Sequence, residues 1–596
     1  MRLDLTQSKD GTSSKLAVVV HGLGSSKLIK DVVTLLGNEL PDADIAQARY
    51  DSSLFSNSPA DKEAHELALE ISRKLEAREK SGESYSSIIL LGHSIGALLL
   101  RAAYLMAAGY RITTQDQLTP TNWARPAPEM GNKQVKKGPY VQRLILLSGL
   151  NNGWTTPEAE QLGRFRRIKS AIITLLITWT NFRDRAKFRR TGMRGSPFVV
   201  DVRLNWLQMI AQAPTTLEPQ TLHLVGETDD LIKRDDIYDF TSGKNFKHRE
   251  VKDTRHYDIG VIETATVNEI RTEFRAGKRL ARWFFGWLLP TYRISENPHG
   301  ERRSELTTAI SSDWDSIGSQ SYGGIQTPVK KSDVVIIRHG IRDDPLGWVS
   351  DLSKAIADHP TSDGIAAEKR SYGRFSMLQF ILRGARIRRV NDFMDEYVDL
   401  RAKYPSAHFH FFGHSYGTYI GCKALKDYRS CRFKHVVLAN AVVASDFPWQ
   451  QILDQGQASK VLNLRGSYDY IVAWFPGAFQ AWREMWGSKK PAKTSDLLGS
   501  AGFTGFYGNL EDGAIKGAHG AGVQETYLPT VAKFLISGVN EFTNKPAPNR
   551  FVALIGRVPF IIWISLLAVG LYAALLLGFP WGLLVPLILV FILHLV

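Results

Sequence analysis

Cysteine is almost absent from this chain. Its 596 residues include only Cys422 and Cys431, and their spacing forms neither a metal-binding nor a redox motif. A chain with so few cysteines needs no disulfide framework and suits a reducing compartment. The sequence therefore predicts a fold held by its hydrophobic core rather than by disulfides.

Two further absences narrow the possible functions. Residues 1–7 are polar and lack the apolar core of a secretory signal. The formal net charge is +15, which is compatible with binding to nucleic acid, to an anionic membrane surface or to acidic substrates. Because neither zinc-finger spacing nor an RNA-binding aromatic motif occurs, nucleic acid is not expected as a partner.

Charged side chains are missing from the C-terminal stretch. Residues 558–596 contain no Asp, Glu, Lys or Arg. A helix needs about 20 apolar residues to cross a bilayer, so we expect a membrane anchor over 545–596 with two spans, about 558–577 and 580–596. A buried helical hairpin is the alternative. Basic side chains just before the stretch favour a cytoplasmic location for the preceding domains. They are Lys545, Arg550 and Arg557.

The rest of the chain has an ordinary globular composition, with 44% hydrophobic and 22% charged residues. Strand-like and helical runs alternate in residues 1–290 and again in 333–544, while the Ser/Gly-rich stretch 291–332 between them predicts a linker. Such alternation predicts the α/β class, here as two mostly parallel sheets flanked by helices, plus the C-terminal transmembrane helical hairpin.

The same five-residue motif occurs once in each block. Gly-His-Ser-Ile-Gly occupies 92–96 and Gly-His-Ser-Tyr-Gly occupies 413–417, each between a strand-like run and a run of helix formers. A serine on a sharp turn from strand to helix holds its hydroxyl above the sheet, and the flanking glycines allow the crowded turn. Ser94 and Ser415 are therefore predicted nucleophiles, and the preceding His93 and His414 are expected to pack in the core.

A second pattern is also repeated. A strand-like run ends in His21-Gly22 in the first block and in His339-Gly340 in the second, at similar distances before the two serines. We therefore expect two long internal repeats of one architecture.

A serine hydroxyl becomes a strong nucleophile when a histidine removes its proton and a carboxylate orients that histidine. After a strand-like run, a Gly-x-x-Asp spacing occurs in both blocks and ends at Asp229 and Asp469. This repetition favours Asp229 over its neighbour Asp230, and both remain candidates.

The candidate bases follow a later strand-like run in each block. His256 is favoured over His248, which falls at the start of its strand. The chain order of serine, acid and histidine is the one expected when each residue follows a successive strand of such a sheet. The predicted catalytic residues are Ser94, Asp229, His256, Ser415, Asp469 and His519.

The negative charge of the reacting oxygen also has to be stabilised, and two backbone N–H groups commonly do this. One is expected from the residue after each serine and one from the loop after the first strong strand of each block. The predicted positions are Leu23 and Ile95 in the first block and Ile341 and Tyr416 in the second. The second loop lacks the second glycine of the first.

Both blocks resemble α/β-hydrolases, and the His-Gly-Leu-Gly of 21–24 together with the motif at 92–96 is similar to lipase and esterase members. The resemblance covers roughly 15–290 and 333–544. It implies hydrolysis of an acyl ester, thioester or amide through an acyl-enzyme on serine, without a metal or an organic cofactor.

The first block contains a long insertion, about 150–212, between its serine and its acid, and we expect it to form a cap over the site. An apolar run at 171–179 lies between arginine-rich runs. It suits either the headgroup boundary of an anionic leaflet or packing against its own domain. A second basic and aromatic run lies at 275–287.

These features together predict a membrane-anchored serine hydrolase that faces the cytoplasm, contacts membrane lipids and cleaves lipid or other acyl esters. Two alternatives remain. One is a thioesterase or amidase acting on acylated proteins, and the other is a membrane-tethered effector or scaffold with a single active half.

Overall fold

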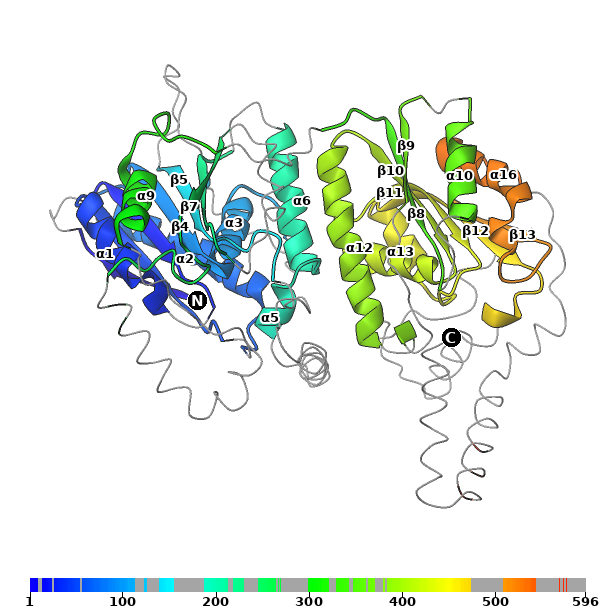
Figure 1. Cartoon of the computed structure of the whole chain (residues 1–596), viewed down its shortest axis with the longest axis horizontal. Helices are drawn as coiled ribbons and strands as arrows, with labels where there is room; N and C mark the ends of the chain where they lie inside the picture. Colours follow the sequence, from blue (N-terminus) through cyan, green and yellow to red (C-terminus); the bar gives the residue numbers. More distant parts are fainter. Residues whose placement is uncertain are drawn as a thin grey trace. The chain divides into compact units, whose positions relative to one another are not determined.

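The computed structural model forms two compact units, Met1–Pro328 and Val329–Val596, and each is described by itself (Figure 1). It describes residues 1–8, 13–23, 26–53, 56–112, 123–125, 139–154, 187–212, 218–229, 245–263, 266, 268, 299–320, 328–341, 347–360, 363–369, 379–380, 383–472, 508–542, 568, 572 and 575.

The first unit is built on a seven-stranded sheet of order β1-β3-β2-β4-β5-β6-β7. The edge strand β1 runs antiparallel to β3, and all the other neighbours are parallel. The strands are β1 Arg2–Thr6, β2 Lys15–Val20, β3 Ala43–Arg49, β4 Ser87–His93, β5 Tyr140–Leu147, β6 Thr221–Gly226 and β7 Phe246–Val251.

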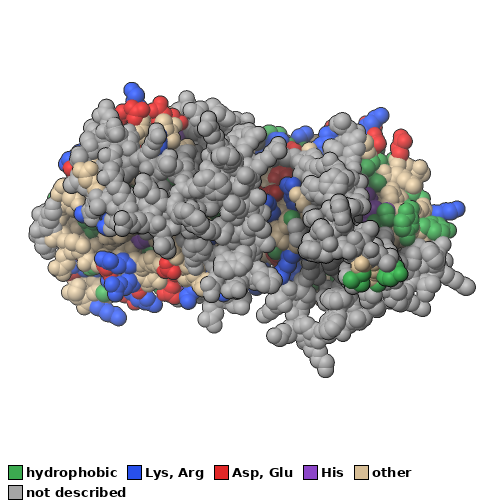
Figure 2. All heavy atoms as spheres, turned by 60° about the horizontal axis from the view of Figure 1, so that its bottom comes forward, with side chains coloured by type: hydrophobic (Ala, Val, Ile, Leu, Met, Phe, Trp, Pro, Cys, Tyr) green, Lys and Arg blue, Asp and Glu red, His purple; other side chains and the backbone are tan. Residues whose placement is uncertain are grey.

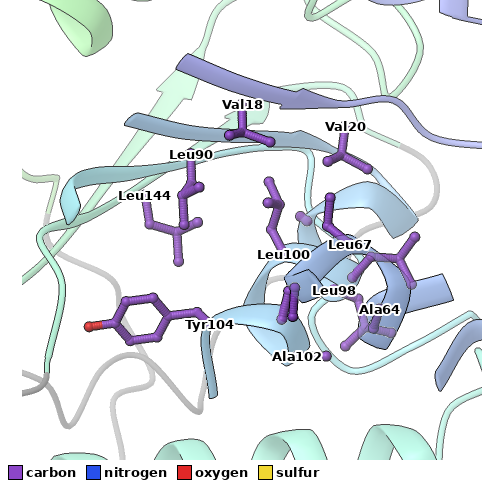
Figure 3. Packing of buried hydrophobic residues seen from close by; sticks show 14 of the residues in the cluster. Val18, Val20, Ala64, Leu67, Leu90, Leu98, Leu100, Ala102, Tyr104 and Leu144 are labelled. Carbon is purple, nitrogen blue, oxygen red and sulfur yellow. The ribbon is translucent and has the colours of Figure 1, made fainter. Parts of the chain in front are cut away.

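Helices cover both faces of this sheet, so its strands are apolar on both sides. Along β2, Val18 and Val20 belong to one buried cluster, whereas Val19 between them belongs to the other. Figure 3 shows the first cluster, in which Leu90 and Leu144 of the sheet face Leu100 and Tyr104 of α3. The helices are α1 Lys30–Glu39, α2 Ala60–Lys80, α3 Ile95–Ala107, α5 Lys187–Thr191, α6 Pro197–Gln212 and α9 His299–Ser311, with the 3-10 helix η1 Ser26–Ile29.

The predicted linker over 291–332 is wrong in its central part. Helix α9 lies inside this range and contributes Leu306, Ala309 and Ile310 to the buried cluster that contains α1. The side chain of Arg143 on β5 donates a 2.6 Å hydrogen bond to the carbonyl of Ala309. The first unit therefore extends to Pro328, because a helix with one buried side lies within the polar Ser/Gly-rich stretch.

The second unit contains a six-stranded parallel sheet of order β13-β12-β11-β10-β8-β9. Its strands are β8 Asp333–Arg338, β9 Ile365–Lys369, β10 His408–His414, β11 Phe433–Ala439, β12 Ala458–Gly466 and β13 Leu510–Ile515. Its helices are α10 Trp348–Ala357, α12 Arg383–Lys403, α13 Tyr416–Asp427, α14 Trp449–Asp454 and α16 Leu528–Ser537, with short 3-10 helices η3 Ala521–Val523 and η4 Glu525–Tyr527.

The two sheets fit the two predicted α/β domains. Without the antiparallel β1, the first sheet reads β3-β2-β4-β5-β6-β7, and the second has the same arrangement as β9-β8-β10-β11-β12-β13. In both units the motif serine follows the strand at the third of these positions, β4 or β10.

The predicted membrane anchor falls almost entirely outside the described residues. Within the described part of the chain, no helix is both long enough and apolar enough to cross a membrane. The two predicted spans, 558–577 and 580–596, are described only at positions 568, 572 and 575.

Candidate active site

Ser94 occupies a strained turn between β4 and α3. Its backbone has φ 56° and ψ −126°, a conformation that L-residues rarely adopt. The neighbouring glycines are required by close backbone approach. A Cβ atom on Gly92 would lie 2.7 Å from Cα of Ala97, and one on Gly96 would lie 2.4 Å from the carbonyl oxygen of Val20. The first motif therefore forms the predicted turn.

Ser415 occupies the equivalent turn between β10 and α13. Its φ and ψ are 51° and −119°, close to the values at Ser94. A Cβ on Gly417 would lie 2.4 Å from the carbonyl oxygen of Arg338, at the end of β8. The same crowding against the neighbouring strand thus accounts for the final glycine of both motifs.

The first unit assembles Ser94, His256 and Asp229. The hydroxyl of Ser94 lies 2.8 Å from Nε2 of His256, and Nδ1 of His256 lies 3.2 Å from Oδ2 of Asp229. The side chains of His256 and Asp229 are 0% and 1% exposed. Buried contacts of this kind let the histidine accept the serine proton while the carboxylate fixes the orientation of its ring.

The second unit assembles Ser415, His519 and Asp469 in the same way. The hydroxyl of Ser415 lies 2.8 Å from Nε2 of His519, whose Nδ1 lies 3.1 Å and 3.0 Å from the two carboxylate oxygens of Asp469. The side chains of His519 and Asp469 are 19% and 10% exposed. Its base and acid are therefore more open to solvent than those of the first unit.

Further donors act on the carboxylate of the second unit. Nδ2 of Asn440 donates a 2.7 Å hydrogen bond to Oδ2 of Asp469, and the backbone N–H of Val472 donates a 3.1 Å bond to Oδ1. These two bonds hold the carboxylate in one orientation. Asn440 was not among the predicted residues, because a contact between the ends of two strands leaves no local pattern in the sequence.

The histidine before each serine has a more specific role than packing. Nε2 of His93 lies 2.9 Å from the backbone carbonyl oxygen of His256, and Nε2 of His414 lies 3.0 Å from that of His519. Burial, with a further contribution from the nearby His256, lowers the pKa of His93 to about 3. A neutral His93 therefore donates its Nε2–H to the loop that carries the catalytic base. The only sequence signal was the histidine shared by both motifs.

Two of the predicted oxyanion positions begin the helices that follow the nucleophiles. Ile95 and Tyr416 are the first residues of α3 and α13, where N–H groups have no acceptor within the helix. A Cβ on Gly22 would lie 2.7 Å from Cβ of Ser94, so the loop containing Gly22 and Leu23 passes close to the nucleophile. The roles of Leu23, Ile95, Ile341 and Tyr416 stay predictions.

The alternative base lies outside the triad. His248 is buried on β7 with its ring centroid 5.7 Å from that of His223, so it belongs to a different cluster from the triad. Asp230 lies outside the described residues. Within the parts of the chain that the structure describes, no group of three His, Cys, Asp or Glu side chains is arranged to hold a metal ion.

The predicted cap is described only in part. Residues 155–186, including the apolar run 171–179, lie outside the described residues, as do 275–287. Near the end of the second arginine-rich run, residues 183–190, Phe188 of α5 is buried, with its ring centroid 5.9 Å from that of Tyr50. This end of the insertion therefore packs against its own unit.

No family model matches this chain, and no curated protein matches it. Among solved structures, a monoacylglycerol lipase of Paleococcus ferrophilus is 16% identical, with a TM-score of 0.26, over 46% of this chain and 98% of its own. A Pyrobaculum calidifontis esterase is 17% identical, with a TM-score of 0.29, over 46% and 80%. Phospholipase PlaB of Legionella pneumophila is 13% identical, with a TM-score of 0.28, over 50% and 63%.

These similarities are weak, so the class of the site is defined by the chain's own geometry. That geometry is a parallel-sheet α/β architecture with a strand–serine–helix turn and a Ser-His-Asp constellation in each unit.

Proposed function

We propose that this chain is a serine hydrolase with two α/β-hydrolase domains, each cleaving acyl esters through an acyl-enzyme. One observation carries the proposal: in both units the serine hydroxyl lies 2.8 Å from Nε2 of a histidine whose Nδ1 faces a carboxylate. Two complete constellations support activity in both halves rather than one silent half.

In the first unit, Oγ of Ser94 attacks the ester carbonyl carbon while Nε2 of His256 accepts the hydroxyl proton. Asp229 stabilises the imidazolium that forms, and the backbone N–H groups of Leu23 and Ile95 stabilise the oxyanion. The tetrahedral intermediate then expels the alcohol oxygen, which takes the proton from His256, and leaves the acyl group on Ser94. Water repeats the sequence on the acyl-enzyme and releases the acid.

The second unit follows the same steps with Ser415, His519 and Asp469. Its oxyanion donors are the N–H groups of Ile341 and Tyr416. Since its base and acid are more exposed than those of the first unit, the two sites need not share a substrate.

The substrate proposed is a lipid or another acyl ester at a membrane facing the cytoplasm. The uncharged run 558–596 supports attachment, and the basic residues before it support this orientation. On the face in Figure 2, basic and acidic side chains lie side by side where the chain is described. The proposed affinity for anionic lipid therefore rests on the basic runs in the sequence, such as 164–169 and 275–287.

The experiment is to trap the acyl-enzyme with a p-nitrophenyl ester, digest the full-length protein and identify the acylated peptides by mass spectrometry. We expect acyl groups on Ser94 and on Ser415, and their loss from one site at a time in His256→Gln and His519→Gln. Hydrolysis no faster than in buffer, with both serines unmodified, would refute the proposal.

A parallel assay compares a phospholipid presented in anionic vesicles with a soluble ester. Removal of residues 545–596 is expected to lower the rate on vesicles and to leave the rate on the soluble ester within about twofold. Equal losses on the two substrates would contradict the proposed attachment to a membrane, and would leave the proposed ester hydrolysis untouched.

A further inference from the structure

Asn440 connects the two loops that carry the acid and the base of the second unit. It follows β11 directly and is 2% exposed. Its Nδ2 donates to Asp469, which follows β12, over 2.7 Å. Its Oδ1 accepts a 3.2 Å hydrogen bond from the N–H of Gly522, three residues after His519. The nitrogen of this buried amide therefore bonds to the loop of the acid, and its oxygen bonds to the loop of the base.

The surrounding backbone leaves space for this amide. A Cβ on Gly466 would lie 2.9 Å from Nδ2 of Asn440, and a Cβ on Gly522 would lie 3.1 Å from its Oδ1. Asn440 itself has φ 52°, in the left-handed region that asparagine tolerates better than most residues. Residue type, conformation and neighbouring glycines therefore all fit an amide at this position.

The equivalent position of the first unit makes no such connection among the described residues. Its equivalent residue is Ser148, because the N–H of Ser148 bonds to Leu224 just as that of Asn440 bonds to Leu464, both over 2.8 Å. Ser148 has φ 42° and is fully buried. Its hydroxyl has no hydrogen-bond partner in the described part of the unit. The acid of the first unit is instead enclosed, since the side chains of Asp229 and His256 are 1% and 0% exposed.

We propose that Asn440 is a positioning residue of the second site, which holds the carboxylate of Asp469 in the orientation that serves His519. This inference rests on the proposed function of the second unit. The side chains of Asp469 and His519 are less enclosed than their counterparts in the first unit. Burial alone therefore does not fix their arrangement, and the Nδ2 donor of Asn440 holds the carboxylate of Asp469 instead. The hydrogen bond is charge-assisted, so its loss has a large effect on the reactivity of Ser415.

Two substitutions separate this role from simple packing. Asn440→Gly removes the amide without straining a positive φ. Asn440→Asp keeps the shape and the acceptor for Gly522, but the introduced carboxyl can donate to Asp469 only while it holds a proton. Two ionised carboxylates in contact repel each other, so the connection is lost as the pH rises and the introduced carboxyl gives up its proton.

The readout is the rate constant for fluorophosphonate labelling of Ser415 in full-length Ser94→Ala protein, from pH 5 to pH 9. We expect Asn440→Gly to lower this rate roughly 10- to 100-fold at every pH. For Asn440→Asp, the measured quantity is the ratio of its labelling rate constant to that of the protein with Asn440. This ratio is expected to be near one at pH 5 and to fall at least about tenfold by pH 9.

The matched control is Ser148→Gly in Ser415→Ala protein, where labelling of Ser94 is expected to stay within about twofold. A pH-independent ratio for Asn440→Asp, or unchanged labelling in Asn440→Gly, would overturn the inference. If Asn440→Gly unfolds the unit, the isosteric Asn440→Asp still decides it. If Ser415 is not labelled even with Asn440 in place, the proposed function of the second unit fails instead.

Discussion

Nε2 of His93 lies 2.9 Å from the backbone carbonyl oxygen of His256, so the residue before the nucleophile holds the loop that carries its base. The second unit repeats the contact between His414 and His519 over 3.0 Å. Serine and base are 162 residues apart in the first unit and 104 in the second. This hydrogen bond links them through the main chain as well as through the reacting atoms.

Replacing His93 tests this link. His93→Phe keeps a buried ring but removes the donor, and leaving a buried carbonyl unpaired costs about 1–3 kcal/mol. We expect labelling of Ser94 by a fluorophosphonate probe to slow roughly three- to tenfold. Ser415 in the same chain is the internal control and should react as before. Unchanged labelling of Ser94 would show that the contact does not position the base.

Acid should destabilise both units through their buried histidines. Burial lowers the pKa of His93 to about 3 and that of His410 to about 4, although the contact with Asp333 acts to raise the latter. The unfolded chain binds these protons near pH 6.5. The stabilising contribution of the neutral rings is therefore complete above about pH 6.5 and is lost as the pH falls toward 4 or 3.

This loss amounts to about 1.4 kcal/mol per pH unit for each such histidine. Urea unfolding at pH 7, 6 and 5 should show falling midpoints, and His410→Asn should flatten the dependence of the second unit. A midpoint that rises on acidification from pH 6 to 5 would contradict the assignment of neutral buried rings.

Gly22→Ala is expected to disable the first site. The added Cβ would lie 2.7 Å from Cβ of Ser94 and 3.0 Å from Nδ1 of His93, so the nucleophile has to shift. Because displacement by about 1 Å can reduce a rate by roughly 100-fold, we expect a loss of that order in esterase activity of Ser415→Ala protein. Gly384→Ala in α12, where nothing lies within 4 Å, serves as the control and should keep full activity.

Helix α9 should be indispensable to the first unit. Leu306 is 1% exposed, and Leu306→Ala should lower the free energy of unfolding of that unit by about 2–5 kcal/mol. Ser304→Ala, on the exposed side of the same helix, should change it by less than about 0.5 kcal/mol. Equal effects of the two substitutions in denaturant unfolding would mean that α9 does not belong to the core.

The serine, acid and histidine of each unit could be predicted because each follows a different strand of one sheet. The repeated Gly-x-x-Asp spacing favoured Asp229 over Asp230 and indicated Asp469, and Asp229 and Asp469 both lie against their histidines. The order of the three residues along the chain is enough to predict that they come together, since the carboxyl ends of parallel strands meet at one edge of the sheet.

Other features depend on tertiary contacts that no local pattern records. Asn440 reaches Asp469 from the end of another strand, and its positive φ is not visible in the sequence. The boundary of the first unit was misplaced because α9 has few apolar residues, among them Leu306 and Ile310, and lies within a polar stretch.

The central claim is that Ser94 and Ser415 are both activated nucleophiles, and fluorophosphonate labelling of the full-length chain tests it most directly. The protein is compared with Ser94→Ala, Ser415→Ala and the double variant. We expect partial labelling in each single variant and none in the double variant. Absence of labelling in the unaltered, folded protein, or full labelling in the double variant, would contradict the claim.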